Sequence, residues 1–164
     1  MTPQDYCKRE PEKLVLQGYR LWSMGIVTQE YTHWEDAWNL FAGTLGADDG
    51  RFVMDAMVRF VRTLGRCAAC PLRTHAPESA WLCQDEILVL GLIAGIQHGD
   101  DKAVQFCLNA LSCSSRCSDV ELAAGEFALT LRSLDKRLLP ISLEVLGNTL
   151  GQIASEDRSN ATLH

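Results

Sequence analysis

The stretch Ile87–Ile96, which reads ILVLGLIAGI, is the longest apolar run in the sequence and decides the fold. A membrane-spanning helix needs about 20 apolar residues, so this run is too short to cross a bilayer and is typical of a buried helix. Its apolar side chains would point to all sides of a helix, as expected for one that passes through the middle of a bundle. We therefore predict a central helix over residues 79–97, followed by a turn at 98–101.

Apolar residues recur at helical spacing on both sides of this run, and no long stretch alternates as a strand does. Proline at a first helical position and the pattern Ser/Thr-x-x-Glu are typical signals of a helix start. They predict helices that begin near Glu10–Pro11, at Thr32-His33-Trp34-Glu35, at Ser118-Asp119-Val120-Glu121 and at Pro140. Another helix is expected from Asp48–Gly50, with one apolar stripe formed by Val53, Ala56, Met57, Phe60, Val61 and Leu64.

The chain has 164 residues, of which 47% are hydrophobic and 22% are charged, the composition of an ordinary globular domain. Together with the helical pattern, this composition predicts an all-α fold. We expect a single-domain bundle of about six or seven helices over residues 1–154. The polar residues 155–164 are expected to form a disordered C-terminal tail.

The net charge of −6 argues against broad binding to nucleic acid or to anionic membranes, because both need a positive surface. The first nine residues lack the basic and apolar regions of a signal peptide. We therefore expect a cytoplasmic protein with reduced thiols and without a membrane partner. Its partners are expected to be proteins, and a homo-oligomer is compatible with the sequence.

Four of the seven cysteines form two closely spaced pairs, Cys67 with Cys70 and Cys113 with Cys117. Thiolates two to four residues apart can bind one tetrahedral metal ion. If the two helices between the pairs form a hairpin, both pairs return to the same end of the bundle. The pattern therefore predicts a site for zinc or an iron–sulfur cluster at these four residues. The alternative is that they only pack, because free cysteine is among the most buried residue types.

The other three cysteines are interpreted differently. Cys83 and Cys107 lie at apolar helical positions and are expected in the core. Both are also candidate replacement ligands, and Cys83 lies near the start of its helix, where the helix dipole favours thiolate. Cys7 is expected to be incidental, in a loose N-terminus.

Residues 51–73 contain five arginines and one acidic residue, a net charge of +4, whereas the rest of the chain carries 10 basic and 20 acidic residues. Arg59, Arg62 and Arg66 share one helical face that leads to Cys67. Guanidinium groups there would lower a thiol pKa and offset the charge of a thiolate-rich centre. They would equally complement a helix C-terminus, or bind an acidic protein or a phosphate.

The sequence Cys67-Ala68-Ala69-Cys70, with His75 shortly after it, is similar to the C-x-x-C and histidine motif of the all-helical alkylhydroperoxidase-like family. The resemblance covers fewer than ten residues, and Pro71 interrupts the helix that is continuous in that family. It implies peroxide or disulfide reduction by Cys67 and Cys70, with His75 as proton carrier.

Further motifs have simpler interpretations. Cys70-Pro71 resembles a thiolate haem ligand, although a proline that ends a helix explains it as well. Glu30 and His33 have the spacing of di-iron bundles, but the sequence has no second such pair, so that site is excluded. Gly91 and Gly95 are expected to permit close helix packing, and the carboxylates of Asp85–Glu86 to lie in a solvated first turn.

We therefore predict an α-helical interaction or regulatory module in which a cysteine-ligated metal braces one end. Phosphate-binding loops, dinucleotide fingerprints and nucleophile elbows are absent from the sequence, which argues against an enzyme. Two alternatives stay open: a thiol redox enzyme that uses Cys67 and Cys70, and a helical interaction domain without metal.

Overall fold

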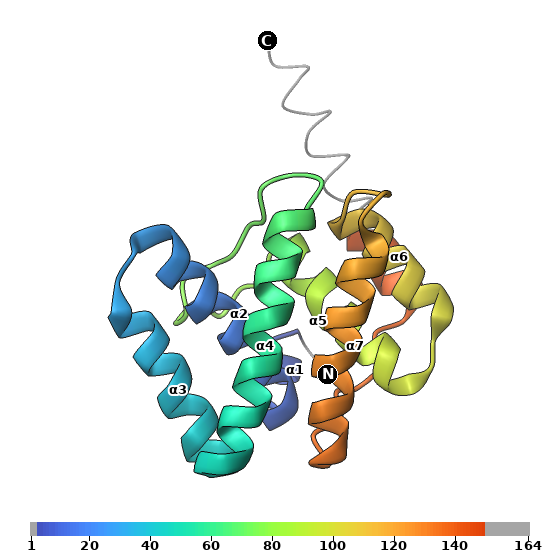
Figure 1. Ribbon diagram of the computed structural model, residues 1–164. Helices are drawn as coiled ribbons and strands as arrows, with labels where there is room; N and C mark the ends of the chain where they lie inside the picture. Colours follow the sequence, from blue (N-terminus) through green and yellow to red (C-terminus); the bar gives the residue numbers. More distant parts are fainter. Residues whose placement is uncertain (1–2, 150–164) are drawn as a thin grey trace.

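The computed structural model describes residues 3–149 and contains seven labelled helices (Figure 1). They are α1 (Pro3–Lys8), α2 (Glu10–Thr28), α3 (Tyr31–Leu45), α4 (Ala47–Cys67), α5 (Gln84–His98), α6 (Asp101–Leu111) and α7 (Cys117–Ser133). A further helical segment covers residues 143–149. The extended pairing within the described residues is limited to one antiparallel bridge, between Ala68 and Ser112. The predicted all-α bundle is confirmed; the predicted tail at 155–164 lies outside the described residues.

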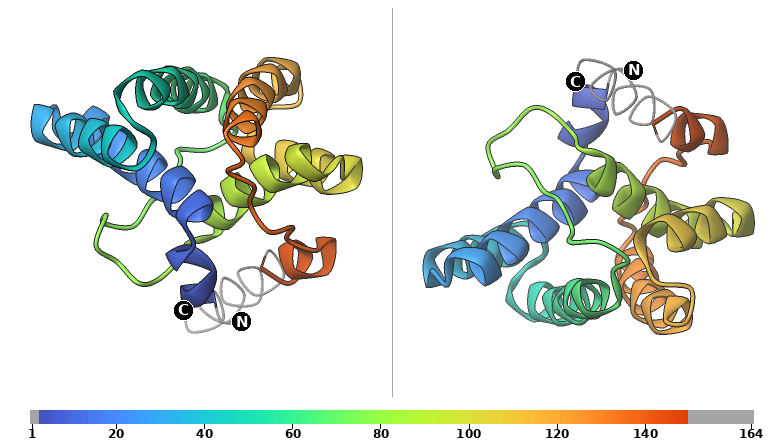
Figure 2. Two further views of the ribbon diagram at one scale, coloured as in Figure 1. Left: turned by 90° about the horizontal axis from the view of Figure 1, so that it is seen from below. Right: turned by 90° about the horizontal axis from the view of Figure 1, so that it is seen from above.

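The helices form two groups that meet at the centre of the molecule (Figure 2). Helices α2, α3 and α4 lie on one side, and α5, α6 and α7 on the other (Figure 1). The two groups are joined where α4 and α7 run antiparallel, side by side. At this junction the Phe60 and Phe127 rings stack with their centroids 5.9 Å apart. The core is therefore shared between the two groups.

Helix α5 is the central helix that the apolar run predicts. Eight consecutive residues are buried: Leu88, Val89, Leu90, Gly91, Leu92, Ile93, Ala94 and Gly95. A Cβ atom added at Gly95 would lie 3.1 Å from Val104 of α6, and one at Gly91 would lie 2.9 Å from Leu146. The interpretation of these two glycines as close-packing positions is confirmed.

The predicted start of the central helix near residue 79 is wrong, because α5 begins at Gln84. Residues 68–83 form a connector without helical structure between α4 and α5. The carbonyl groups of Ser79 and Trp81 accept hydrogen bonds from the Arg20 side chain, on α2. A distant donor thus satisfies backbone groups that a helix would otherwise have used. The helix is instead started by Cys83, which forms a capping box with Glu86.

Three other predicted helix starts are also shifted. Helix α3 begins at Tyr31 after the N-cap residue Glu30, and α7 begins at Cys117 after Arg116. Neither N-cap side chain makes a capping hydrogen bond, so the two predicted Thr and Ser capping boxes are wrong. Residues 140–142 are not helical, so Pro140 does not open the last segment. The apolar stripe of α4 is confirmed, since all six of its predicted residues are buried.

The N-terminal segment is more ordered than the sequence suggests. Cys7 lies in α1, is half-buried and packs against the core, so its interpretation as part of a loose N-terminus is wrong. Tyr6 donates a hydrogen bond to the Leu139 carbonyl group over 2.9 Å. This contact ties α1 to the segment that follows α7.

Among the described residues, no helix combines the length and the apolar character needed to cross a bilayer.

Candidate functional site

The two predicted cysteine segments lie side by side at one end of the bundle. The α5–α6 hairpin returns the chain to the C-terminal end of α4 (Figure 1). There the Cys113 N–H group donates to the Cys67 carbonyl over 2.8 Å, and Ala69 N–H donates to the Leu111 carbonyl over 3.3 Å. These bonds flank the bridge between Ala68 and Ser112. The prediction that the two segments meet is confirmed.

The side chains of the four cysteines have unlike surroundings, and all four are free thiols. Cys67 is buried, and Cys117 is half-buried with its sulfur 3.1 Å from the Ser112 hydroxyl. Cys70 and Cys113 are exposed. The backbone therefore brings the two segments together, with two thiols directed inward and two toward solvent.

The exposed Cys113 thiol lies next to hydrogen-bonding groups of Ser115 that stabilise its thiolate form. Its sulfur lies 3.4 Å from the Ser115 hydroxyl. Hydrogen bonds from the Ser115 side chain and backbone lower the pKa of the Cys113 thiol. By contrast, burial raises the pKa of Cys107 to about 12 and that of Cys83 to about 11. Cys107 is fully buried as predicted, whereas Cys83 is a half-buried N-cap residue.

The predicted metal site at Cys67, Cys70, Cys113 and Cys117 stays a prediction. In the part of the chain that the structure describes, no three His, Cys, Asp or Glu side chains form a group that could hold a metal ion. A shared zinc ion would require four sulfurs at about 2.3 Å from one point, which needs a rearrangement of the exposed thiols. Metal analysis of anaerobically purified protein would test for zinc or an iron–sulfur cluster.

A hollow of about 690 Å³ lies between α4 and α7, next to the cysteine segments. We call it the α4–α7 groove and define it by Arg59, Arg62, Thr63, Arg66, Cys67, Arg116, Asp119, Leu122, Ala123 and Glu126. Four arginines and two carboxylates line it, so the groove is positive on a chain whose net charge is −6.

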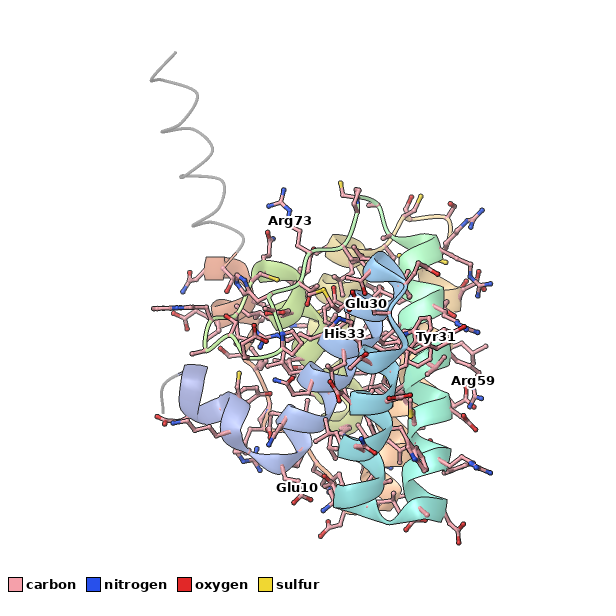
Figure 3. The ribbon with its side chains drawn as sticks, turned by 90° about the vertical axis from the view of Figure 1, so that its left-hand side faces the viewer. Glu10, Glu30, Tyr31, His33, Arg59 and Arg73 are labelled. Carbon is pink, nitrogen blue, oxygen red and sulfur yellow. The ribbon has the colours of Figure 1, made fainter. Side chains whose placement is uncertain are left out.

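Two of the four groove arginines are held by neighbours. Arg59 of α4 pairs with Glu126 of α7 at 2.7 Å, and its side chain projects away from the bundle (Figure 3). The Arg62 guanidinium carbon lies 5.8 Å from the centre of the Trp22 ring, within the range of a cation–π contact. Arg66 and Arg116 are exposed at the cysteine end of the groove. Their guanidinium groups are accessible to an anionic partner.

The groove also exposes apolar surface. Leu122 of α7 lines it with 78% of its surface exposed. Leu129, two turns further along α7, is 48% exposed. Residues three to four positions apart lie on one helical face, so Leu122, Glu126 and Leu129 form one row beside the arginines. Exposed leucines in a row are typical of a surface that contacts another protein.

The structure also contains a buried ionic network that the sequence interpretation missed. Glu86 of α5 is 0% exposed and accepts five hydrogen bonds. Arg20 donates through Nε at 2.8 Å and Nη2 at 3.0 Å. Thr74 Oγ1, His75 N and Cys83 N are the other donors. Burial alone would raise the pKa of Glu86, but these hydrogen bonds outweigh burial and lower it.

This network fastens the connector to the bundle. Arg20 is 1% exposed and also donates to the carbonyls of Ser79 and Trp81. The backbone of Arg73 is held as well, because its N–H donates to Asp85 at 2.7 Å and its carbonyl accepts from Tyr19 at 3.0 Å. The Arg73 side chain projects away from the connector (Figure 3). The expectation of a solvated Asp85–Glu86 turn is therefore wrong.

One sequence signal could have revealed this network. Cys83-Gln84-Asp85-Glu86 has the spacing of a capping box, with cysteine in place of serine. The partner Arg20 carries no such signal, because it lies 66 positions away on α2.

The structure also places two other motifs that the sequence suggested, His75 and the pair Glu30 and His33. His75, the predicted proton carrier of the redox alternative, lies on the connector with its backbone N–H bound to Glu86 at 2.8 Å. Glu30 and His33 approach each other to 3.5 Å at the start of α3, on the surface of the molecule (Figure 3). The redox alternative stays a prediction.

Comparisons with known proteins give no relative: no family model, no curated protein and no solved structure matches this chain.

Proposed function

We propose that this chain is a protein-interaction module that binds an acidic, amphipathic helical segment of a partner in the α4–α7 groove. The observation that carries the proposal is the combination of Arg66, Arg116 and the exposed Leu122 along one groove. An amphipathic helix recognised in a groove presents apolar anchors one or two turns apart, with polar residues beside them.

The electrostatics favour an acidic partner. Four arginines meet two carboxylates in the groove, and one of these carboxylates, Glu126, is already paired with Arg59. Arginine binds carboxylates through a planar pair of hydrogen bonds, which adds orientation to attraction. A row of glutamates on the partner would therefore meet Arg66 and Arg116 while its leucines contact Leu122.

The rest of the molecule favours a protein over a nucleic acid. Outside residues 51–73 the chain carries 20 acidic and 10 basic residues, and this net negative charge disfavours binding of a long phosphate backbone. The partly apolar lining suits leucine side chains better than phosphates. A short acidic helix fits both the charge and the extent of this groove.

Fluorescence anisotropy with a defined peptide tests the proposal. The probe is a labelled amphipathic helix about four turns long, with leucines on one face and glutamates on the other. We expect saturable binding that weakens as salt rises, because exposed charges are screened. Arg66→Glu should weaken binding by at least about tenfold, which corresponds to about 1.4 kcal/mol.

Matched controls make the outcome decisive. Arg137→Glu makes the same charge change at an exposed position outside the groove and should leave the affinity unchanged. A peptide of the same composition with its leucines scattered should bind more weakly. The proposal is wrong if the helical peptide does not bind, if Arg66→Glu has no effect, or if a single-stranded RNA displaces the peptide from the groove.

A further inference from the structure

A second hollow, of about 370 Å³, lies between α1, α2 and the last part of the connector. We call it the α1–α2 pocket; the residues used below are Cys7, Lys8, Lys13, Leu16, Arg20 and Leu82. Its volume is within the range of small-molecule sites, which begins at about 300 Å³. It does not share a lining residue with the α4–α7 groove.

The charged side chains that line this pocket are all cations. Lys8, Lys13 and Arg20 line it, and no carboxylate among the described residues does so. The two carboxylates in the first turn of α2 are engaged elsewhere, since Glu10 pairs with Lys136 and Glu12 with Arg9. A ligand in the pocket would therefore meet the charges of Lys8 and Lys13 without a competing carboxylate in the wall, whereas the charge of Arg20 is balanced by Glu86.

Arg20 gives the pocket a fixed polar group. Its side chain is 1% exposed and is held by Glu86, Ser79 and Trp81. A guanidinium has five N–H groups. Four of them donate to these described partners, so one N–H on Nη1 is left for a ligand. Because the network fixes the guanidinium beforehand, ligand binding would not have to order it.

The remaining wall is uncharged. Leu16 is 4% exposed and, with Leu82, gives the pocket an apolar side. Burial raises the pKa of Cys7 to about 11, so this thiol is neutral at pH 7. An apolar wall with convergent cationic groups is the usual arrangement of a site for an organic anion.

We propose that the α1–α2 pocket binds a small organic anion, a carboxylate or phosphate monoester that carries a short apolar chain. The anionic head contacts Lys13, Lys8 and the free N–H of Arg20, and the apolar chain lies against Leu16 and Leu82. This site is independent of the α4–α7 groove.

Isothermal titration calorimetry of the full chain with hexanoate, hexyl phosphate and hexylamine tests the proposal. The two anions should bind at least about tenfold more tightly than the amine of the same chain length. The ratio of the two anions distinguishes a carboxylate site from a phosphate site. Bound anion should also slow alkylation of Cys7, which lines the pocket.

Charge variants locate the site. Lys13→Glu should weaken anion binding by at least about tenfold, while Lys13→Arg retains it. Lys102→Glu is the matched control, an exposed position on α6 with the same change of charge. Lys13 and Lys102 are both exposed, so these variants are expected to fold, which circular dichroism would verify.

Three results would overturn the proposal: equal affinity for the amine and the anions, unchanged binding in Lys13→Glu, or no heat of binding for any of the three compounds. Arg66→Glu, in the groove, should bind hexanoate as the unaltered chain does. Failure of this proposal is therefore distinguishable from failure of the proposed peptide site.

Discussion

At the scale of single residues, replacing Glu86 is expected to have a large effect on stability. Its carboxylate is buried and balances the equally buried charge of Arg20. Removing one partner of a buried ion pair leaves the other charge without compensation, which typically costs about 3–5 kcal/mol. Glu86→Gln should lower the free energy of unfolding by about this amount, measured by urea denaturation at pH 7. Glu126→Gln, which breaks the exposed pair with Arg59, should change it by less than about 1 kcal/mol.

The same carboxylate makes stability depend on pH. Because the pKa of Glu86 is lower in the folded chain than in the unfolded chain, the unfolded chain binds the proton first as pH falls. The stabilisation is present above the unfolded pKa of about 4.3 and is lost as pH falls through the folded pKa. Glu86→Gln should flatten this part of the stability curve. A curve that keeps its slope in the variant would assign the acid sensitivity to other groups.

The reactivity of each cysteine thiol also depends on its own surroundings. The lowered pKa of Cys113 gives it more thiolate at pH 7 than an ordinary thiol would have. We expect iodoacetamide to modify Cys113 ahead of the buried Cys107, as mass spectrometry would show. Ser115→Ala removes the hydrogen-bonding hydroxyl and should slow the reaction of Cys113 at pH 7. The exposed Cys70 is the internal reference, and an equal slowing there would contradict this explanation.

At the scale of elements, the segment 143–149 docks on α5 through one small residue. A Cβ atom at Gly91 would lie 2.9 Å from Leu146 and 3.1 Å from the Cys107 sulfur. Gly91→Ala should therefore destabilise the chain by about 1–3 kcal/mol, the usual cost of overpacking. In a Leu146→Ala background the same change should cost less, because the cavity accepts the methyl group. Equal costs in both backgrounds would show that the two side chains are not coupled.

The sequence predicts elements where the determining contacts are local. The stripe of α4 and the apolar run of α5 are visible as spacing alone, and both are confirmed. The connector is not predictable in this way, because its carbonyls are satisfied by Arg20, about 60 positions earlier. A helix start can be predicted from a capping pattern only if no such distant donor competes for the backbone.

The α4–α7 groove could likewise be predicted only in the part that depends on local sequence. The sequence places Arg59, Arg62 and Arg66 on one face and leads that face to Cys67. It gives no indication of Arg116 and Leu122, which complete the groove from α7. Their contribution depends on α4 pairing with α7, and that pairing arises from packing such as the stacking of Phe60 on Phe127.

At the scale of the whole molecule, the two helix groups share one core and should unfold together. Three of the four tryptophans, Trp22, Trp34 and Trp38, lie in α2 and α3, and the fourth, Trp81, lies on the connector, whereas far-ultraviolet circular dichroism reports on every helix. We expect tryptophan fluorescence and circular dichroism to give coincident urea transitions, as in a two-state domain. A fluorescence transition at lower urea would show that the α2–α4 group opens separately.

One side-chain amide, that of Gln97 in α5, makes three hydrogen bonds at the end of α7 and in the segment after it. Its nitrogen donates to the carbonyls of Ala128 and Lys136, each at 3.0 Å, and its oxygen accepts from Leu138 N–H at 2.8 Å. A carboxylate of the same length has no proton to give, and an ammonium has no lone pair to offer. Hydrolysis of the Gln97 amide to a carboxylate would thus place a negatively charged oxygen against the carbonyl groups of Ala128 and Lys136, and two hydrogen bonds would become repulsive contacts. Any distant descendant that keeps this architecture is expected to keep an amide at this position, even where its whole surface has diverged.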